Sequence, residues 1–119
     1  MMQSMLSKSG KTALLDMRHH IALAFRFIEG FDYAGFADDE RTVYAVTRCL
    51  EIISEASRRL PDDLKNRHKA IPWQRMAAAG NVYRHDYEDV AARFVWDTVV
   101  RDLRMPQGIV EGEIERGME

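Results

Sequence analysis

Apolar residues recur at intervals of three and four along most of this chain, and that spacing constrains the fold more than any other feature. Within residues 12–29 the apolar positions on this spacing are Leu14, Met17, Ile21, Phe25 and Ile28. Residues so spaced share one face of an α-helix, so the segment predicts a helix with one buried side. Gly30 suits the C-terminal end of that helix. No segment of any length alternates apolar and polar residues as a half-buried strand would.

The same pattern predicts a second and a third helix. The second is expected over residues 40–60, with Asp38 and Asp39 before it as a capping pair. Pro61 ends it, because proline inside a helix removes a hydrogen bond and clashes with the preceding turn. The third runs from residue 72 to about residue 83, with a proline in its first turn, where proline is well tolerated.

A fourth helix is expected over residues 90–103, closed by Pro106 and Gly108. Two other segments lack a helical pattern in this interpretation. Residues 31–37, which are aromatic and contain glycine, are expected to form a connecting loop. Residues 105–119 form an acidic, glycine-containing tail that is expected to be flexible.

These helices predict an all-α fold, an up-down bundle of four main helices in a single domain over residues 1–119 with its core in about 12–104. Hydrophobic residues make up 46% and charged residues 30% of the chain, which fits a globular protein. No apolar run approaches the length of a membrane span, and the N-terminus lacks the apolar region of a secretory signal. A cytoplasmic location is therefore the default expectation.

The net charge of −2 excludes recruitment of nucleic acid by a basic surface as a whole. Any RNA contact must come from a local cluster of cations. One run of the sequence is rich in them: Arg58, Arg59, Lys65, Arg67 and Lys69. Most such runs are solvated faces, and a minority contact phosphates.

Several other residues have an ordinary structural interpretation. Cys49, the only cysteine, is expected to be buried, and His68 is expected to be solvated in a charged loop. Asp16 and His20 have the spacing of two metal ligands on a helix, but two residues make no metal site, and ion pairing is far commoner. Trp73 and Trp96, the two tryptophans, are expected to anchor the core or a dimer interface.

Four short motifs appear in a characteristic order. They are Leu50-Glu51-Ile52-Ile53-Ser54-Glu55-Ala56, Ile71-Pro72-Trp73, Gly80-Asn81-Val82-Tyr83-Arg84-His85-Asp86-Tyr87 and Val95-Trp96-Asp97-Thr98. With these motifs the chain resembles the HepT-like family of HEPN-domain proteins over roughly residues 14–103. Serine stands at position 54, where glycine is common in that family, and glycine stands at position 80, where the family has arginine.

The resemblance implies a HEPN fold, a homodimer and a metal-independent endoribonuclease without cofactors. It also implies the toxin of a toxin–antitoxin pair, whose partner is a minimal nucleotidyltransferase antitoxin. The histidine of the HEPN motif maps to His85, and the polar residue after the arginine position maps to Asn81. Tyr87 maps to the tyrosine that receives AMP in some members. Arg84 is the cation nearest to the histidine.

The residue types fit RNA cleavage on their own chemistry. Histidine can move protons near neutral pH, so His85 is the candidate acid and base. An arginine fork can hold two phosphate oxygens, which makes Arg84 the candidate phosphate clamp and Asn81 an orienting group. On a continuous helix Asn81, Arg84, His85 and Glu88 share one polar face. Without the family resemblance, His85 would more simply be a surface histidine in a charged turn.

Two rival interpretations belong to other classes. Gly80 favours a catalytically inactive HEPN domain that only binds a nucleotidyltransferase, because loss of the arginine removes a stabiliser of transition-state charge. A nucleotide-binding or purely structural four-helix module is the third. For Tyr87, three roles are open: a core group with one hydrogen bond, a base-stacking platform and an acceptor of modification. Chemistry alone ranks the structural role first, and the family resemblance raises modification level with it.

Overall fold

The structure, a computed structural model, describes the backbone of residues 8–85 and 88–117 and the side chains of residues 9–80 and 92–117. Within these residues the chain is helical apart from short connections, and no strand is formed. The all-α prediction is confirmed. The helices of the described residues are α1 (Lys8–Ile28), α2 (Tyr33–Asp38), α3 (Glu40–Arg58), α4 (Asp62–Arg67), α5 (Trp73–His85), α6 (Glu88–Asp97), the π-helical stretch η1 (Thr98–Asp102) and α7 (Arg104–Gly117).

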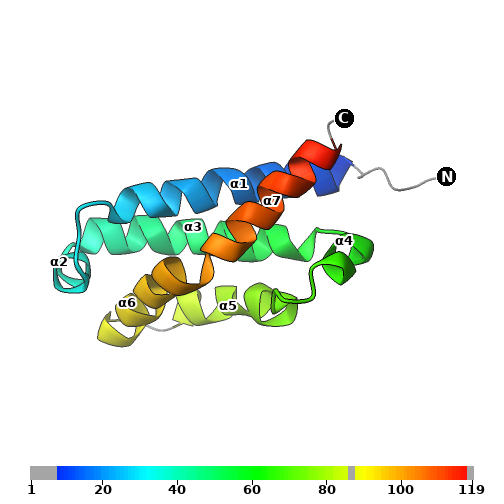
Figure 1. Ribbon diagram of the computed structural model, residues 1–119. Helices are drawn as coiled ribbons and strands as arrows, with labels where there is room; N and C mark the ends of the chain where they lie inside the picture. Colours follow the sequence, from blue (N-terminus) through cyan, green and yellow to red (C-terminus); the bar gives the residue numbers. More distant parts are fainter. Residues whose placement is uncertain (1–7, 86–87, 118–119) are drawn as a thin grey trace.

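Helix α3 lies at the centre of the bundle. It packs between α1 on one side and α5 on the other, and α7 crosses α1 (Figure 1). The short helices α2 and α4 lie at opposite ends of α3, where they connect it to α1 and α5 (Figure 1). Two faces of α3 are therefore covered by other helices, and its polar edge is left to solvent.

The turn between α1 and α3 is more ordered than the sequence suggested. Gly30 ends α1 with φ of 82°, a left-handed conformation that favours glycine, as predicted. The expectation of a loop over residues 31–37 is wrong, because the short helix α2 begins at Tyr33. Its N-cap is Asp32, whose carboxylate accepts a hydrogen bond of 2.8 Å from Gly35 N. Asp39 caps α3 in the same way through Thr42 N, at 3.1 Å, which confirms the predicted capping role.

The tryptophan at the start of α5 fixes where this helix begins. Trp73 Nε1 donates to the carbonyl oxygens of Lys65 in α4 and of His68, at 3.2 and 3.1 Å. Leu64 anchors α4 in the core and is fully buried. The short helix α4 and the indole together hold the first turn of α5 in place, and Trp73 is thus an anchor within the chain.

The expectation of a flexible tail is wrong, because residues 104–117 form helix α7. Pro106 does not end a helix, since it lies in the first turn of α7, where its missing N–H would have no helical partner. Pro106, Val110 and Ile114 are buried against the rest of the bundle. Their spacing of four residues places them on one face of α7.

The core is formed by the stripes that the periodicity predicted, together with α7. Its buried apolar residues include Leu14, Met17, Ile21, Val46, Leu50, Ile53, Val95, Val99, Leu103 and Val110. Cys49 is among them at 2% exposure, as expected, and burial raises the pKa of its thiol to about 11. This thiol is a poor nucleophile at neutral pH.

A buried carboxylate joins α7 to α4. Glu113 is 4% exposed; its carboxylate accepts a 2.9 Å hydrogen bond from Arg67 Nη2 and lies 2.6 Å from His68 Nε2. The expectation that His68 is solvated is therefore wrong. Burial alone would raise the pKa of Glu113, but the hydrogen bonds from Arg67 and His68 outweigh it and hold that pKa below its usual value.

An aromatic cluster joins α6 to α2. Trp96 lies edge-on to Tyr33 and tilted against Phe36, with ring centroids 6.0 and 5.2 Å apart. The Arg93 guanidinium lies 3.7 Å from the Tyr33 ring centroid. Trp96 is thus a core anchor of the single chain. In the part of the chain that the structure describes, no helix is long and apolar enough to cross a membrane.

Candidate functional site

Helix α5 carries the candidate motif. It runs without interruption from Trp73 to His85, so the backbone positions of Asn81, Arg84 and His85 belong to one helix. The third helix was expected to end near residue 83, and the structure extends it to His85. The side chains of these three residues lie outside the described part, and so does Tyr87. Their contacts therefore stay predictions.

Gly80 is buried where α5 meets α3. Its N–H donates to Ser54 Oγ at 3.2 Å, and a Cβ added at Gly80 would lie 3.1 Å from that oxygen and 3.5 Å from Ser54 Cβ. A side chain at position 80 would therefore enter the seam between the two helices. The two positions where this chain departs from the pattern of its resemblance, 54 and 80, contact each other.

Ser54 and Arg58 bind the same carbonyl oxygen of α5. Ser54 Oγ donates to Ala77 O at 2.8 Å, and Arg58 Nη1 donates to it at 2.7 Å. The two residues are one turn apart on α3, so their side chains leave that helix on the same side. Ser54 is buried and Arg58 is exposed. These two hydrogen bonds hold the turn of α5 that precedes Asn81 against α3.

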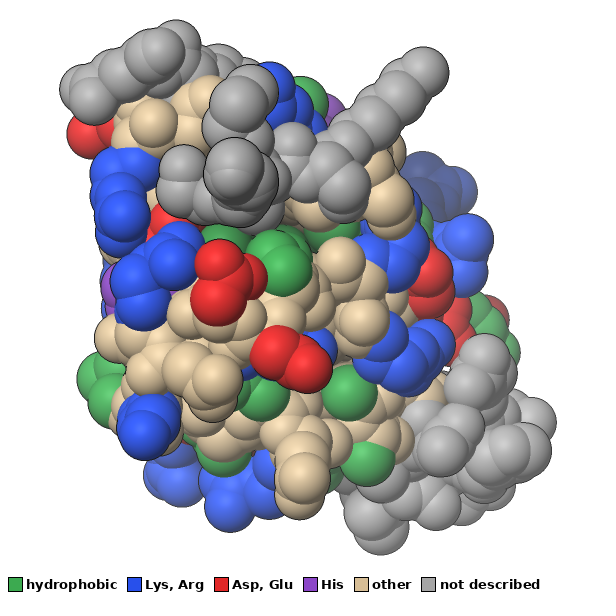
Figure 2. Space-filling view, turned by 90° about the vertical axis from the view of Figure 1, so that its right-hand side faces the viewer, with side chains coloured by type: hydrophobic (Ala, Val, Ile, Leu, Met, Phe, Trp, Pro, Cys, Tyr) green, Lys and Arg blue, Asp and Glu red, His purple; other side chains and the backbone are tan. Residues whose placement is uncertain are grey.

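The basic run after position 57 does not form one cationic surface. Arg59 pairs with Asp16 at 2.9 Å and with Glu55 at 3.2 Å. Arg67 pairs with Glu113 at 2.9 Å. Figure 2 shows the face at one end of the molecule, where Lys and Arg side chains are interspersed with acidic ones. Two of the five cations of this run are thus paired with carboxylates, so the run does not form a broad basic patch.

Asp16 and His20, which have the spacing of two metal ligands, make other contacts in the structure. The Asp16 carboxylate pairs with Arg59, and His20 Nδ1 lies 2.7 Å from Asp16 O. Among the described residues, no group of three or more His, Cys, Asp or Glu side chains is arranged to hold a metal ion.

The contact of Arg58 with α5 is the feature that sequence reasoning missed. In the sequence this arginine belongs to a basic run, and nothing there separates it from Arg59 beside it. The sequence does hold one indication that Arg58 is special. It lies one helical turn after Ser54, which belongs to a recognised motif. That spacing alone could not identify Ala77 as the shared partner.

Comparison with known proteins identifies the family. A family profile described as ribonuclease HepT-like matches residues 17–111. A protein of Thermococcus cleftensis named "Probable ribonuclease HepT" is 37% identical over 106 residues, which cover 89% of this chain and 96% of that protein. A protein of Methanocaldococcus jannaschii named "Putative RNase MJ0125" is 32% identical over 78% of this chain and 80% of its own length.

A third relative, from Caldanaerobacter subterraneus, is named "Putative RNase TTE0752" and is 30% identical over 64% of this chain and 68% of its own length. No solved structure matches the chain. The profile covers all of α3 and α5 and ends within α7. This chain belongs to the HepT-like family.

Proposed function

We propose that this protein is a metal-independent endoribonuclease that acts on RNA as a homodimer. The observation that carries the proposal is the unbroken helix α5, which places Asn81, Arg84 and His85 on one helix in a member of the HepT-like family. The named relatives support it, since three of them are called probable or putative RNases.

The reaction needs only groups that this chain supplies. A ribose 2′-hydroxyl attacks the adjacent phosphorus, the bond to the 5′-oxygen breaks, and a cyclic phosphate and a 5′-hydroxyl result. One histidine takes the proton of the 2′-hydroxyl and another gives a proton to the leaving 5′-oxygen. In a homodimer with a two-fold axis, the two copies of His85 supply both groups.

Arg84 is proposed as the phosphate clamp in place of the arginine missing at position 80. It follows Gly80 by four residues, so its backbone position lies on nearly the same side of α5, one turn further along. A planar guanidinium there can bind two oxygens of the phosphate whose charge increases in the transition state. Asn81 orients the same phosphate.

The biological role proposed is that of a toxin neutralised by a minimal nucleotidyltransferase antitoxin. Tyr87 is the candidate acceptor of AMP from that partner. An AMP group two residues after His85 would add a negative charge and bulk beside the catalytic pair. Both effects would oppose the approach of an RNA phosphate.

A second candidate function rests on the packing of Gly80. Position 80 is buried against Ser54, and a side chain there would crowd Ser54 Oγ, so glycine stands in place of the usual arginine in a tightly packed seam. If Arg84 does not replace it, the protein would be a catalytically inactive HEPN domain that binds a nucleotidyltransferase.

One experiment separates the two candidates. Wild type, His85→Ala, Arg84→Ala and Tyr87→Phe are each induced in cells and each purified and incubated with tRNA and mRNA. The ribonuclease proposal expects growth arrest and cleavage by wild type, both lost in His85→Ala and Arg84→Ala. It expects Tyr87→Phe to remain active and to escape AMP transfer by the partner. A wild type that binds the nucleotidyltransferase but cuts no RNA, even at high concentration, would support the binding role instead.

A further inference from the structure

The side chain of Arg58 is the part of the structure that the proposed reaction leaves unexplained. Its guanidinium reaches across the seam from α3 and donates to Ala77 O on α5 at 2.7 Å. The residue is nonetheless exposed, so its remaining N–H groups are accessible to solvent. An exposed arginine held at one end by a fixed carbonyl has lost part of its rotational freedom before any ligand arrives.

The charge of Arg58 is not neutralised by the acidic residues of its own helix. Glu55 pairs with Arg59 at 3.2 Å, and Glu51 pairs with Arg48 at 3.4 Å. Among the ion pairs between described residues, none involves Arg58. The Arg58 guanidinium thus lies at the surface beside α5 with no carboxylate partner among the described residues.

The position of this charge relative to the motif follows from the helix. Asn81 and Arg84 follow Ala77 by four and seven residues on the unbroken helix α5. With a rise of about 1.5 Å per residue, they lie about 6 and 10 Å further along the axis. The contact of Arg58 with Ala77 O thus lies one to two helical turns before the backbone positions of Asn81 and Arg84.

We propose that Arg58 binds the RNA substrate at a phosphate neighbouring the scissile one. This inference rests on the proposed ribonuclease function and adds a substrate-binding residue on α3 to the motif on α5. A preordered guanidinium is well suited to phosphate oxygens. Because the scissile phosphate itself is bound elsewhere, Arg58 contributes to binding in the ground and transition states alike.

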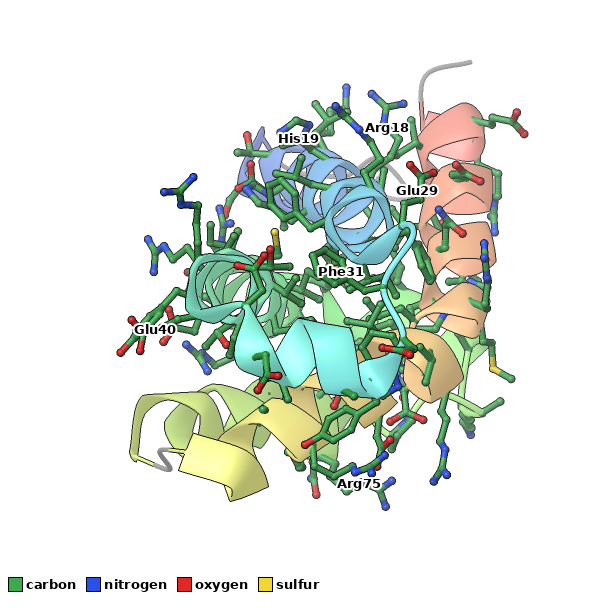
Figure 3. The ribbon with its side chains drawn as sticks, turned by 90° about the vertical axis from the view of Figure 1, so that its left-hand side faces the viewer. Arg18, His19, Glu29, Phe31, Glu40 and Arg75 are labelled. Atoms are coloured by element: carbon green, nitrogen blue, oxygen red, sulfur yellow. The ribbon has the colours of Figure 1, made fainter. Side chains whose placement is uncertain are left out.

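Three variants test this with matched controls. Arg58→Ala removes the charge and the contact with Ala77 O. Ser54→Ala removes the other hydrogen bond to the same carbonyl without changing any charge, so it controls for loosening of the α3–α5 seam. Arg18→Ala removes an exposed arginine from α1, on the side of the bundle away from α5, and controls for net charge (Figure 3).

The probe is a fluorescent single-stranded RNA oligonucleotide. Binding is measured between about 50 and 200 mM salt in a His85→Ala background, where cleavage does not interfere. Cleavage kinetics are measured with His85 intact, and thermal melting of each variant reports on folding.

Arg58→Ala is expected to weaken RNA binding about tenfold, as loss of a charged hydrogen bond does. Its plot of log affinity against log salt should be shallower by about 0.7, the value for one single-strand phosphate contact. In cleavage, KM should rise by about the same factor with kcat little changed. Ser54→Ala should melt at lower temperature with an unchanged salt slope. A fourth variant, Arg58→Lys, keeps the positive charge and should retain the salt slope of its parent.

Several results would overturn the inference. An Arg58→Ala protein with the salt slope of its parent, or one that differs no more than Arg18→Ala does, would show that Arg58 contacts no phosphate. A change in oligomeric state in place of a change in slope would assign Arg58 to an interface between copies of the chain. If these results occur while wild type cleaves RNA, only the Arg58 inference fails. If wild type neither binds nor cleaves RNA, the proposed function fails with it.

Discussion

Replacement of Gly80 by alanine has an effect whose sign depends on the residue at position 54. In wild type the new Cβ would lie 3.1 Å from Ser54 Oγ, closer than ordinary contact allows. Ser54 cannot turn away freely, because it is buried and donates to Ala77 O at 2.8 Å. Overpacking of this kind costs about 1–3 kcal/mol, whereas alanine in place of glycine inside a helix contributes about 1 kcal/mol. Gly80→Ala should therefore destabilise the protein by about 1 kcal/mol.

Ser54→Ala removes the crowding atom. The remaining distance between the two Cβ positions is 3.5 Å, an ordinary van der Waals contact. In the Ser54→Ala background, Gly80→Ala keeps only its gain in helix propensity. It should therefore raise the free energy of unfolding by about 1 kcal/mol. The two substitutions should then differ from additivity by about 2 kcal/mol, within the range seen for residues in contact.

The measurement is urea denaturation of wild type, both single variants and the double variant, followed by circular dichroism at one protein concentration. The reasoning is refuted if Gly80→Ala has the same effect in both backgrounds. It is also refuted if Gly80→Ala stabilises wild type, because the Oγ contact would then cost nothing. Ala78→Ser, at an exposed position of α5, serves as a control. Its effect on the free energy of unfolding should add to that of Ser54→Ala.

Two further predictions concern the end of the bundle at which α4 lies. Glu113→Gln should lower the free energy of unfolding by about 2 kcal/mol at neutral pH, because it removes charged hydrogen bonds from Arg67 and His68. Since the pKa of Glu113 is held below its usual 4.5, this contribution is complete above the unfolded pKa and is lost as pH falls through the folded pKa. Denaturation curves of wild type and variant should converge in acid, and a gap independent of pH would contradict this account. Trp73→Phe removes the donor to Lys65 O and His68 O, and should cost about 1 kcal/mol and speed amide exchange in α4. Unchanged exchange in α4 would show that the indole N–H does not hold the two helices together.

The sequence predicted the parts of the fold that depend on local periodicity. Regular apolar stripes defined α1 and α3, and Gly30 and Asp39 marked a helix end and a helix start correctly because their roles are local. The helix α7 was missed for a physical reason. Its apolar positions are sparse and its composition is acidic. Pro106 suggests a helix end in the sequence, although it lies in the first turn of α7.

The polar contacts between helices could not be predicted from the sequence. His68 and Glu113 are 45 residues apart, so no local pattern could show that they pair. The same holds for Arg58 and Ala77, 19 residues apart. For the candidate site, the sequence identified the motif residues and their helix, while the roles of Arg84, His85 and Tyr87 stay predictions.

The departures from the family pattern at positions 54 and 80 are best understood together. Glycine at position 80 suits the serine at position 54, because a Cβ at position 80 would lie 3.1 Å from Ser54 Oγ. Ser54 Oγ also donates a hydrogen bond to Ala77 O. Arg58, one turn further along α3, donates to the same oxygen. The chain thus has no cation at position 80, while Arg58 on the neighbouring helix places an exposed one at the same seam. Because each of the two arginines is proposed to bind a different phosphate of the RNA, the double variant Arg58→Ala with Arg84→Ala should bind RNA more weakly than either single variant.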